Sequence, residues 1–217
     1  MKTVLFIDGR NLLGKFKEIL SAEGTLEEDL SNYDWSNYDF KGLFGKVLEG
    51  IVVDEKRIYF GKLKVHQDTW MKSKQLIEEQ RKLKTKLEAQ GFTVILAGSV
   101  RGNYVDDGNG KGKRTLVFKE KGADVSIAVD MVTMSCEGSI KTSILASSDS
   151  DMQPAIKSIK SKSVESIYLG FEINPNIGLT ATNNKAILIR NSEVVEFKKE
   201  APLELPLTKS EPPTLPL

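Results

Sequence analysis

Two short acidic motifs lie far apart in the sequence, and each directly follows a run of apolar residues. The run at 4–7 leads to Asp8, and the run at 144–146 leads to Asp149 and Asp151. Short apolar runs bounded by small residues predict buried strands of a parallel sheet. Because ligands of open α/β sheets bind beyond the carboxyl ends of the strands, we expect both motifs to face one acidic pocket.

Two further polar residues extend the predicted pocket. Asn11 follows the first motif, and Asp124 lies two residues after Gly122, at the predicted start of another helix. A single aspartate at the start of a helix is often only an N-cap that accepts backbone N–H groups. Four aspartates at matching ends of strand–helix units instead favour a metal site. The predicted metal ligands and catalytic carboxylates are Asp8, Asp124, Asp149 and Asp151, with Asn11 as a polar partner that orients a ligand or phosphate.

The ligand types indicate which metal would bind. Clustered carboxylates repel one another, so a divalent cation is needed to hold them together. The chain has one histidine, His66, and one cysteine, Cys136, too few for a zinc site. Oxygen ligands favour Mg²⁺ or Mn²⁺. Such an ion lowers the pKa of a bound water and neutralises charge on a phosphate, so the predicted chemistry is phosphoryl transfer to water.

Other hydrolase classes fit these motifs less well. A phosphatase with an aspartate nucleophile needs an Asp-x-Asp pattern after the first strand, where this chain has Arg10 two residues beyond Asp8. Serine–histidine hydrolysis in its usual form would need His66 in the pocket, and we expect His66 on the surface or in a loop. Arg10 either contacts the scissile phosphate or neutralises the acidic cluster, and the sequence leaves both roles open.

An alternation of strand and helix runs through the chain. Strands are predicted at residues 3–7, 57–63, 92–97, 142–146, 166–170 and 186–190, and helices at 11–20, 40–48, 68–90, from 122 and from 150. Asp68 would cap the long helix and Gly91 would end it. The helix from Gly122 is nearly continuous in apolar residues, so we expect it to be buried. The pattern predicts a three-layer α/β/α domain with a mostly parallel central sheet.

Two segments interrupt the alternation. Residues 100–105 and 114–118 flank a turn-rich loop and predict a β-hairpin. Residues 23–39 carry interleaved aromatic residues in an acidic, irregular stretch. They form either a lid or, as we favour, a loop whose aromatic side chains pack on the body of the protein.

Composition sets the broad class of protein. At 217 residues the chain fits one domain at 1–199 and a proline-rich tail at 200–217, which we expect to be flexible and to bind a protein partner. The net charge of +1 gives no global attraction to nucleic acid or membrane, so a basic footprint must be local. Cys136, which we expect to be a buried thiol, fits a reducing compartment. The first apolar run is too short for a signal peptide or membrane span, so we expect a cytoplasmic protein that does not bind membranes.

Local positive charge lies on the predicted hairpin and beside the first motif. Tyr104 and Phe118 are available to stack on the bases of a single strand. The alternative is an ordinary solvated hairpin, and the sequence does not choose between the two. The predicted substrate-binding residues are Arg10, Arg101, Lys113, Arg114, Lys121 and Ser148.

Three motifs in order, at 6–12, 121–125 and 147–152, resemble the NYN domain family, PIN-like ribonuclease domains that include the LabA-like proteins. The resemblance implies a PIN-like α/β/α fold, a carboxylate cluster that binds Mg²⁺ or Mn²⁺, and a role in RNA cleavage. By position, Asp8, Asp124, Asp149 and Asp151 match the family's acidic residues and Asn11 its polar partner. The chain departs from the family at Ser148, often glycine, and at Met152, often aromatic, and neither departure removes a predicted ligand.

The expected function is therefore that of a Mg²⁺- or Mn²⁺-dependent endoribonuclease that hydrolyses RNA, with single-stranded RNA as the expected substrate. The alternative is a nucleic-acid-binding regulatory protein with a weak or inactive nuclease site. The sequence leaves the oligomeric state open, with a homodimer as one option.

Overall fold

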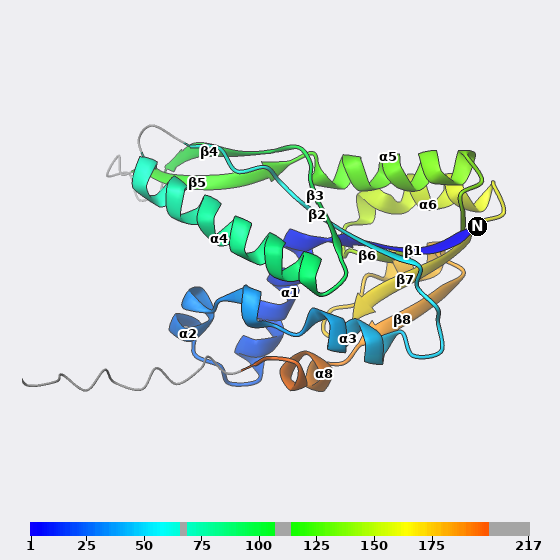
Figure 1. Ribbon diagram of the computed structural model, residues 1–217, viewed down its shortest axis with the longest axis horizontal. Coiled ribbons are helices and arrows are strands. Elements are labelled where there is room, and N and C mark those ends of the chain that lie inside the picture. Colours follow the sequence, from blue (N-terminus) through cyan, green and yellow to red (C-terminus); the bar gives the residue numbers. More distant parts are fainter. Residues whose placement is uncertain (66–68, 107–113, 200–217) are drawn as a thin grey trace, which may run out of the picture.

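The computed structural model describes residues 1–65, 69–106 and 114–199. Its centre is a six-stranded sheet in which every pair of neighbours is parallel, in the order β3-β2-β1-β6-β7-β8 (Figure 1). The predicted α/β class is confirmed, and the sheet is wholly rather than mostly parallel. The strands are β1 (Lys2–Asp8), β2 (Glu55–Phe60), β3 (Thr93–Leu96), β6 (Ile140–Ala146), β7 (Glu165–Phe171) and β8 (Lys185–Ile189).

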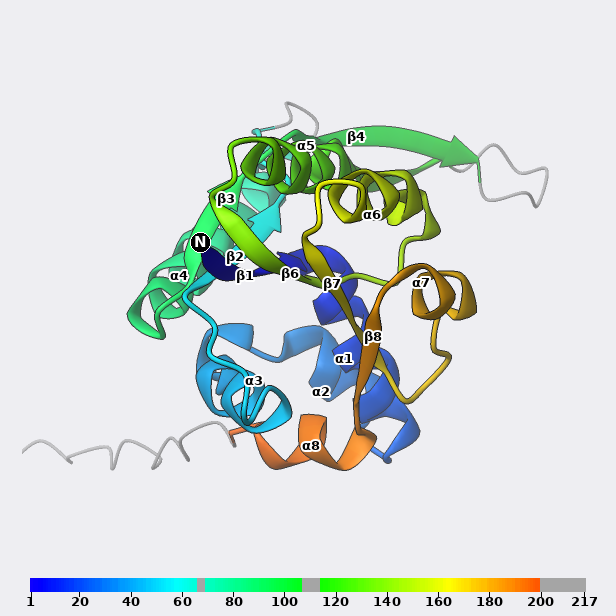
Figure 2. The same ribbon diagram turned by 90° about the vertical axis from the view of Figure 1, so that its right-hand side faces the viewer.

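Helices cover both faces of this sheet, which makes the three-layer PIN-like arrangement (Figure 2). Alternate residues of β1 enter two separate cores, Leu5 and Ile7 on one face and Val4 and Phe6 on the other. This is the period-two pattern of a strand that is buried on both faces. The first face carries α1 (Gly9–Ala22), α3 (Phe40–Val47), α4 (Trp70–Ala89) and α8 (Asn191–Glu196), and the second carries α5 (Ala123–Cys136), α6 (Gln153–Lys160) and α7 (Ile177–Thr182).

The strand order reverses between β1 and β6. From β1 the chain proceeds outward through β2 and β3, whereas from β6 it proceeds in the opposite direction through β7 and β8. Ile7 lies beside Ala146 in the parallel register, so the residues that follow the two strands emerge side by side. Such a switch point is the usual ligand site of an open α/β sheet.

The predicted hairpin is confirmed as a separate antiparallel pair, β4 (Ser99–Asp106) and β5 (Arg114–Lys121). It begins and ends at two glycines with left-handed backbone, Gly98 with φ +69° and Gly122 with φ +90°. A Cβ atom on Gly98 would lie 2.1 Å from the carbonyl oxygen of Lys121. The two glycines lie close together at the base of the hairpin, and α5 begins directly after Gly122.

The segment 23–39 packs on the body, which confirms the favoured alternative. It contains α2 (Glu27–Asn32) and a short 3₁₀ turn at Trp35–Asn37, so it is more regular than predicted. Tyr38 is fully buried, its hydroxyl donates to the carbonyl of Val194 at 2.8 Å, and its ring lies 4.8 Å from that of Phe16.

The helices α7 and α8 were not predicted, because each is only about one and a half turns long and lacks a clear apolar period.

Two predictions of burial are wrong. The helix α5 packs on the sheet through Ile127 and Met131, but Val125 and Val129 are 60% and 56% exposed. Only residues spaced by about one turn reach the sheet, so an apolar run does not bury the whole helix. Cys136, in the last turn of α5, is likewise exposed.

Several predictions fall on parts of the chain outside the described residues. They concern His66, Asp68 and the tail at 200–217. The prediction that Asp68 caps the long helix is wrong, because α4 begins at Trp70 with Thr69 as its N-cap. The division into a domain at 1–199 and a flexible tail therefore stays a prediction. At the other end of the long helix, Gly91 has φ +85°, the left-handed backbone expected after a helix.

Gly9 is required for a reason that the sequence did not reveal. It is the first residue of α1, and a Cβ atom there would lie 2.3 Å from Cε1 of Phe60 in β2. The sequence suggested only a tight turn after Asp8. The structure shows a close contact between the start of α1 and the neighbouring strand.

We predict that Gly9→Ala destabilises the protein by about 1–3 kcal/mol, because the ring of Phe60 must shift within a packed core. Gly14 in the same helix has no atom within 4 Å of a Cβ, so Gly14→Ala should instead stabilise by up to about 1 kcal/mol. Urea denaturation of both variants measures the difference. Equal effects of the two substitutions would contradict the steric explanation.

Candidate active site

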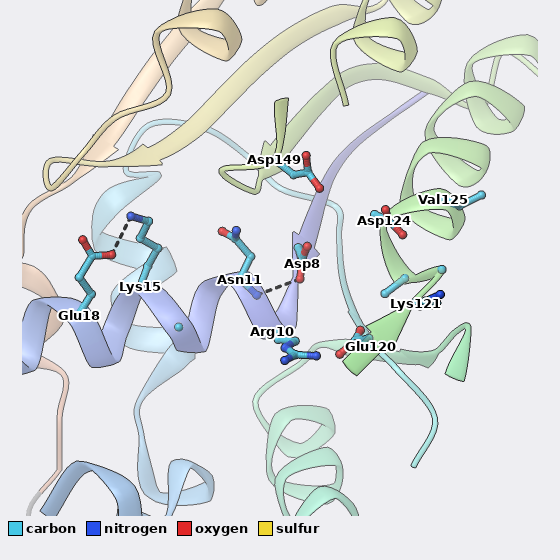
Figure 3. A pocket seen from close by; sticks show the side chains of 13 residues that line it. Asp8, Arg10, Asn11, Lys15, Glu18, Glu120, Lys121, Asp124, Val125 and Asp149 are labelled. Carbon is cyan, nitrogen blue, oxygen red and sulfur yellow. Dashed lines mark hydrogen bonds and ion pairs between the residues drawn. The ribbon is translucent and has the colours of Figure 1, made fainter. Parts of the chain in front are cut away.

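A cavity of about 660 Å³ lies at the carboxyl ends of the central strands (Figure 3). It is formed by the end of β1 with the start of α1, by the junction of β5 and α5, and by the loop after β6. It is therefore built on the switch point of the sheet. Its charged and amide-bearing residues are Asp8, Arg10, Asn11, Lys15, Glu18, Glu120, Lys121, Asp124 and Asp149.

Asp8 lies at the centre of this constellation. It ends β1 and caps α1, and its Oδ1 accepts the backbone N–H of Asn11 at 3.0 Å. Burial raises the pKa of Asp8, the N–H bond from Asn11 opposes that rise, and the negative charges of Asp149 and then Asp124 add to it. The three aspartates thus lie close enough to interact electrostatically, although two of them are more than 110 residues from Asp8 in sequence.

Two aspartates of this site cap helices and also line the same cavity. Asp149 follows β6, and its Oδ1 accepts the N–H of Asp151 at 2.9 Å. Asp124 lies in the first turn of α5, whose N-cap is Gly122. A carboxylate has about four acceptor sites on its two oxygens, so the caps made by Asp8 and Asp149 do not use all of them. Their role as helix caps therefore does not prevent these aspartates from also binding a cation.

Asn11 connects the two halves of the site. Its side-chain oxygen accepts the backbone N–H of Ser148 at 3.0 Å. The side-chain amide of Asn176 donates to the carbonyl of Ser148 at 2.9 Å. The peptide groups on both sides of Ser148 are thus held by side chains from α1 and from the cap of α7. These two bonds fix the loop that carries Asp149.

Asp151 does not line the cavity that Asp8, Asp124 and Asp149 share. Its side chain is exposed. It lies instead along a neighbouring groove that it shares with Asp124. Asp151 lies within the 3₁₀ turn at Ser150–Met152, of which Asp149 is the N-cap.

Glu120 is a cavity carboxylate that sequence reasoning missed, as is Glu18, which is paired with Lys15. Glu120 comes from the end of β5, and its Oε1 is buried without a hydrogen-bond partner among the described residues. Burial raises its pKa, followed by the charge of Asp8, and a backbone N–H from Gly61 opposes the rise. A Cβ atom on Gly61 would lie 2.6 Å from Cγ of Glu120, so the glycine makes room for it. The sequence signal for Glu120 is its position directly before the motif at 121–125, between Lys119 and Lys121.

Three cationic side chains also line the cavity. Arg10 and Lys121 line it, and Lys15 lines it while paired with Glu18 at 2.8 Å. Of the predicted hairpin contacts, Arg101 lies in β4 and Arg114 in β5, where the structure describes the backbone. Lys113 lies outside the described residues.

The donor set fits a hydrated hard cation. In the described ranges no three Asp, Glu, His or Cys residues are grouped closely enough to hold an ion by themselves. Mg²⁺ is usually held by one or two carboxylates, waters and substrate phosphates, so a wider carboxylate ring is compatible with it. The unpartnered Oε1 of Glu120 and the mutual repulsion at Asp8 are both relieved by a bound cation.

Comparison with protein families identifies the class of domain. The family model described as "NYN domain" matches residues 2–188. The chain therefore belongs to the NYN domain family of PIN-like nuclease domains, which usually use divalent metals. The chain is also similar to a solved structure from Vibrio parahaemolyticus RIMD 2210633, described as a protein of unknown function. That similarity has a TM-score of 0.54 and 18% sequence identity, covers 87% of this chain and 92% of the other, and shows the shared fold alone. A search of curated proteins found no relative.

None of the helices in the described part of the chain combines the length and the apolar character that crossing a membrane requires.

We predict that Asp8→Asn stabilises the metal-free protein at pH 7. The raised pKa of Asp8 means that the folded state holds this proton more tightly than the unfolded chain does. Stability is therefore lost as the pH rises from the unfolded pKa of about 3.9 through the higher folded pKa. Asparagine keeps the oxygen that caps α1 and removes the charge, so the Tm in EDTA should rise by a few degrees at pH 7 and change little at pH 3.

The control for this measurement is Asp39→Asn. Asp39 also caps a helix, accepting the N–H of Gly42 at 2.8 Å, but lies outside the cavity and near Lys199. Its substitution should leave the Tm unchanged or lower it. A Tm of the Asp8 variant at or below that of the wild type at pH 7 would contradict the electrostatic account.

We predict that Asn11→Ala loosens the loop that carries Asp149. It removes the acceptor for the N–H of Ser148, a change that costs about 1 kcal/mol. Amide hydrogen exchange at Ser148 should accelerate by severalfold. The amide of Gly42 serves as the internal reference, because its acceptor on Asp39 lies outside this loop. Unaltered exchange at Ser148 would show that the bond does not hold the loop.

Proposed function

We propose that this protein is a Mg²⁺- or Mn²⁺-dependent endoribonuclease that hydrolyses phosphodiester bonds of single-stranded RNA. The observation that carries the proposal is the convergence of Asp8, Asp124, Asp149 and Glu120 on one cavity at the switch point of the sheet. Membership of the NYN family supports a nuclease, and the oxygen-only donor set supports a hard divalent cation.

The residues of the cavity divide into three roles in this proposal. Asp8, Asp124 and Asp149 would hold the cation, with Glu120 beside them. A bound cation of this kind polarises a phosphate and lowers the pKa of a bound water. Arg10 and Lys121 line the same cavity and attract the phosphodiester anion of the substrate. Asn11 acts as a positioning residue because it holds the loop before Asp149.

The preference for RNA as a single strand rests on the hairpin. Its sequence supplies Arg101, Lys113 and Arg114 for the phosphate backbone, and Tyr104 and Phe118 for stacking on bases. The backbone of β5 leads directly to Lys121 at the cavity, which connects the hairpin with the site. A cytoplasmic location, a homodimer and a protein partner for the tail belong to the same proposal.

Asp149→Asn tests the proposed function. The amide keeps the oxygen that accepts the N–H of Asp151, so the loop should keep its fold while the charge is lost. Cleavage of a fluorescently labelled single-stranded RNA in Mn²⁺ should fall by at least about 100-fold. EDTA should abolish cleavage by the wild type, and added Mn²⁺ or Mg²⁺ should restore it.

Asp39→Asn again provides the matched control and should cleave like the wild type. Cleavage that survives both EDTA and Asp149→Asn would exclude the proposed site. Tight RNA binding by the wild type without product at any Mn²⁺ or Mg²⁺ concentration would favour a regulatory RNA-binding protein with an inactive site. A rise in Tm with Mn²⁺ in the wild type but not in Asp149→Asn reports metal binding independently of turnover.

A further inference from the structure

A second hollow, of about 490 Å³, lies between α5 and α6 next to the acidic cavity. The two helices lie side by side in both ribbon views (Figures 1 and 2). The hollow, called here the α5–α6 groove, is mostly apolar. Its lining residues are Asp124, Val125, Ala128, Val129, Val132, Thr133, Asp151, Met152 and Ala155.

Two valines on the rim of the groove are exposed and do not pack into the core. Val125 and Val129 are 60% and 56% exposed, whereas Met152 and Ala155 form a nearly buried floor. Exposed apolar side chains that line a hollow together mark a binding site more often than isolated ones do. The groove falls within the range of about 300–1,000 Å³ typical of small-ligand pockets, which suits a nucleotide-sized group.

The groove is continuous with the proposed cleavage site. Asp124 and Val125 line both hollows, and Val125 stands beside Asp124 in the close view of the acidic cavity (Figure 3). A phosphodiester held at Asp8 and Asp124 would therefore have its adjoining nucleoside next to the groove. This step rests on the proposed function.

The charges of the two hollows differ. The acidic cavity contains Arg10 and Lys121, whereas none of the residues that line the groove is cationic. A phosphate is thus disfavoured in the groove. A flat, neutral, largely apolar group with hydrogen-bond donors on its edge matches the valines and methionine together with the acceptors of Asp151 and Thr133. Nucleobases have this chemistry.

We propose that the α5–α6 groove binds a nucleobase of the substrate strand, next to the phosphodiester held in the acidic cavity. Base contacts would then supply affinity that does not depend on the charge of the backbone. They would also account for the location of Asp151, which lines the groove but not the acidic cavity.

The test is the binding of a short single-stranded RNA and of an abasic ribose-phosphate strand of the same length. Dissociation constants are measured by fluorescence anisotropy in Ca²⁺, a hard cation that takes oxygen ligands, and a gel checks that the strands stay intact. The wild type should bind the base-bearing strand more tightly than the abasic strand by about tenfold or more. Val129→Ser removes apolar surface from the groove and should reduce that ratio by about fivefold.

The matched control is Val195→Ser, because Val195 is also a partly exposed valine on a helix, α8, on the opposite face of the sheet. It should keep the wild-type ratio. The inference is overturned if the wild type does not discriminate between the strands, if Val129→Ser keeps the full ratio, or if it weakens both strands equally. Dissociation of a wild-type dimer by Val129→Ser would also overturn it, since the groove would then be an interface between copies of the chain.

Failure of the proposed function would be distinguishable. If the wild type does not cleave RNA in Mn²⁺ but binds the base-bearing strand more tightly than the abasic strand, the nuclease is rejected and the base-binding groove is kept. Metal-dependent cleavage with no base-dependent ratio would reject the groove but keep the nuclease.

Discussion

The pairing of β1 with β6 is the constraint on which the candidate site depends. It joins segments more than 130 residues apart and sets Ile7 beside Ala146, so that the residues beyond both strands meet. A slip of one residue in this register would exchange Val4 and Phe6 with Leu5 and Ile7 between the two cores. Burial on both faces of β1 therefore enforces the register, and the register brings Asp8 to the loop that carries Asp149.

The site that results is electrostatically unfavourable on its own. Five carboxylates line one cavity. The pKa values of Asp8 and Glu120 are both raised, first by burial and then by neighbouring negative charge. Local hydrogen bonds hold the arrangement together: the caps made by Asp8 and Asp149, and the bond from Ser148 to Asn11. Stability is thus given up at a position where a divalent cation would recover it, as is typical of functional sites.

The helix α5 links this acidic cavity to the rest of the molecule. Its first turn carries Asp124, its inner face packs on the sheet through Ile127 and Met131, and its outer face carries Val125 and Val129. The two glycines at the base of the hairpin, Gly98 and Gly122, place the start of this helix against the cavity. A single helix therefore belongs to the core, to the proposed metal centre and to the proposed base-binding groove.

The sequence by itself determined the strand–helix alternation, the parallel sheet, the hairpin and the positions of the aspartates after their strands, because apolar runs and turn residues are local signals. The meeting of Asp8 and Asp149 followed from the rule that parallel strands present their carboxyl ends at one edge. Asp124 instead follows β5 of the antiparallel hairpin, so that rule does not account for its place in the cavity. Only the tertiary structure decided that Glu120 joins them, that Asp151 faces a different groove and that one side of α5 is exposed. These outcomes depend on how the hairpin, α5 and α6 pack against the sheet, and contacts between distant segments leave no periodic signal in the chain.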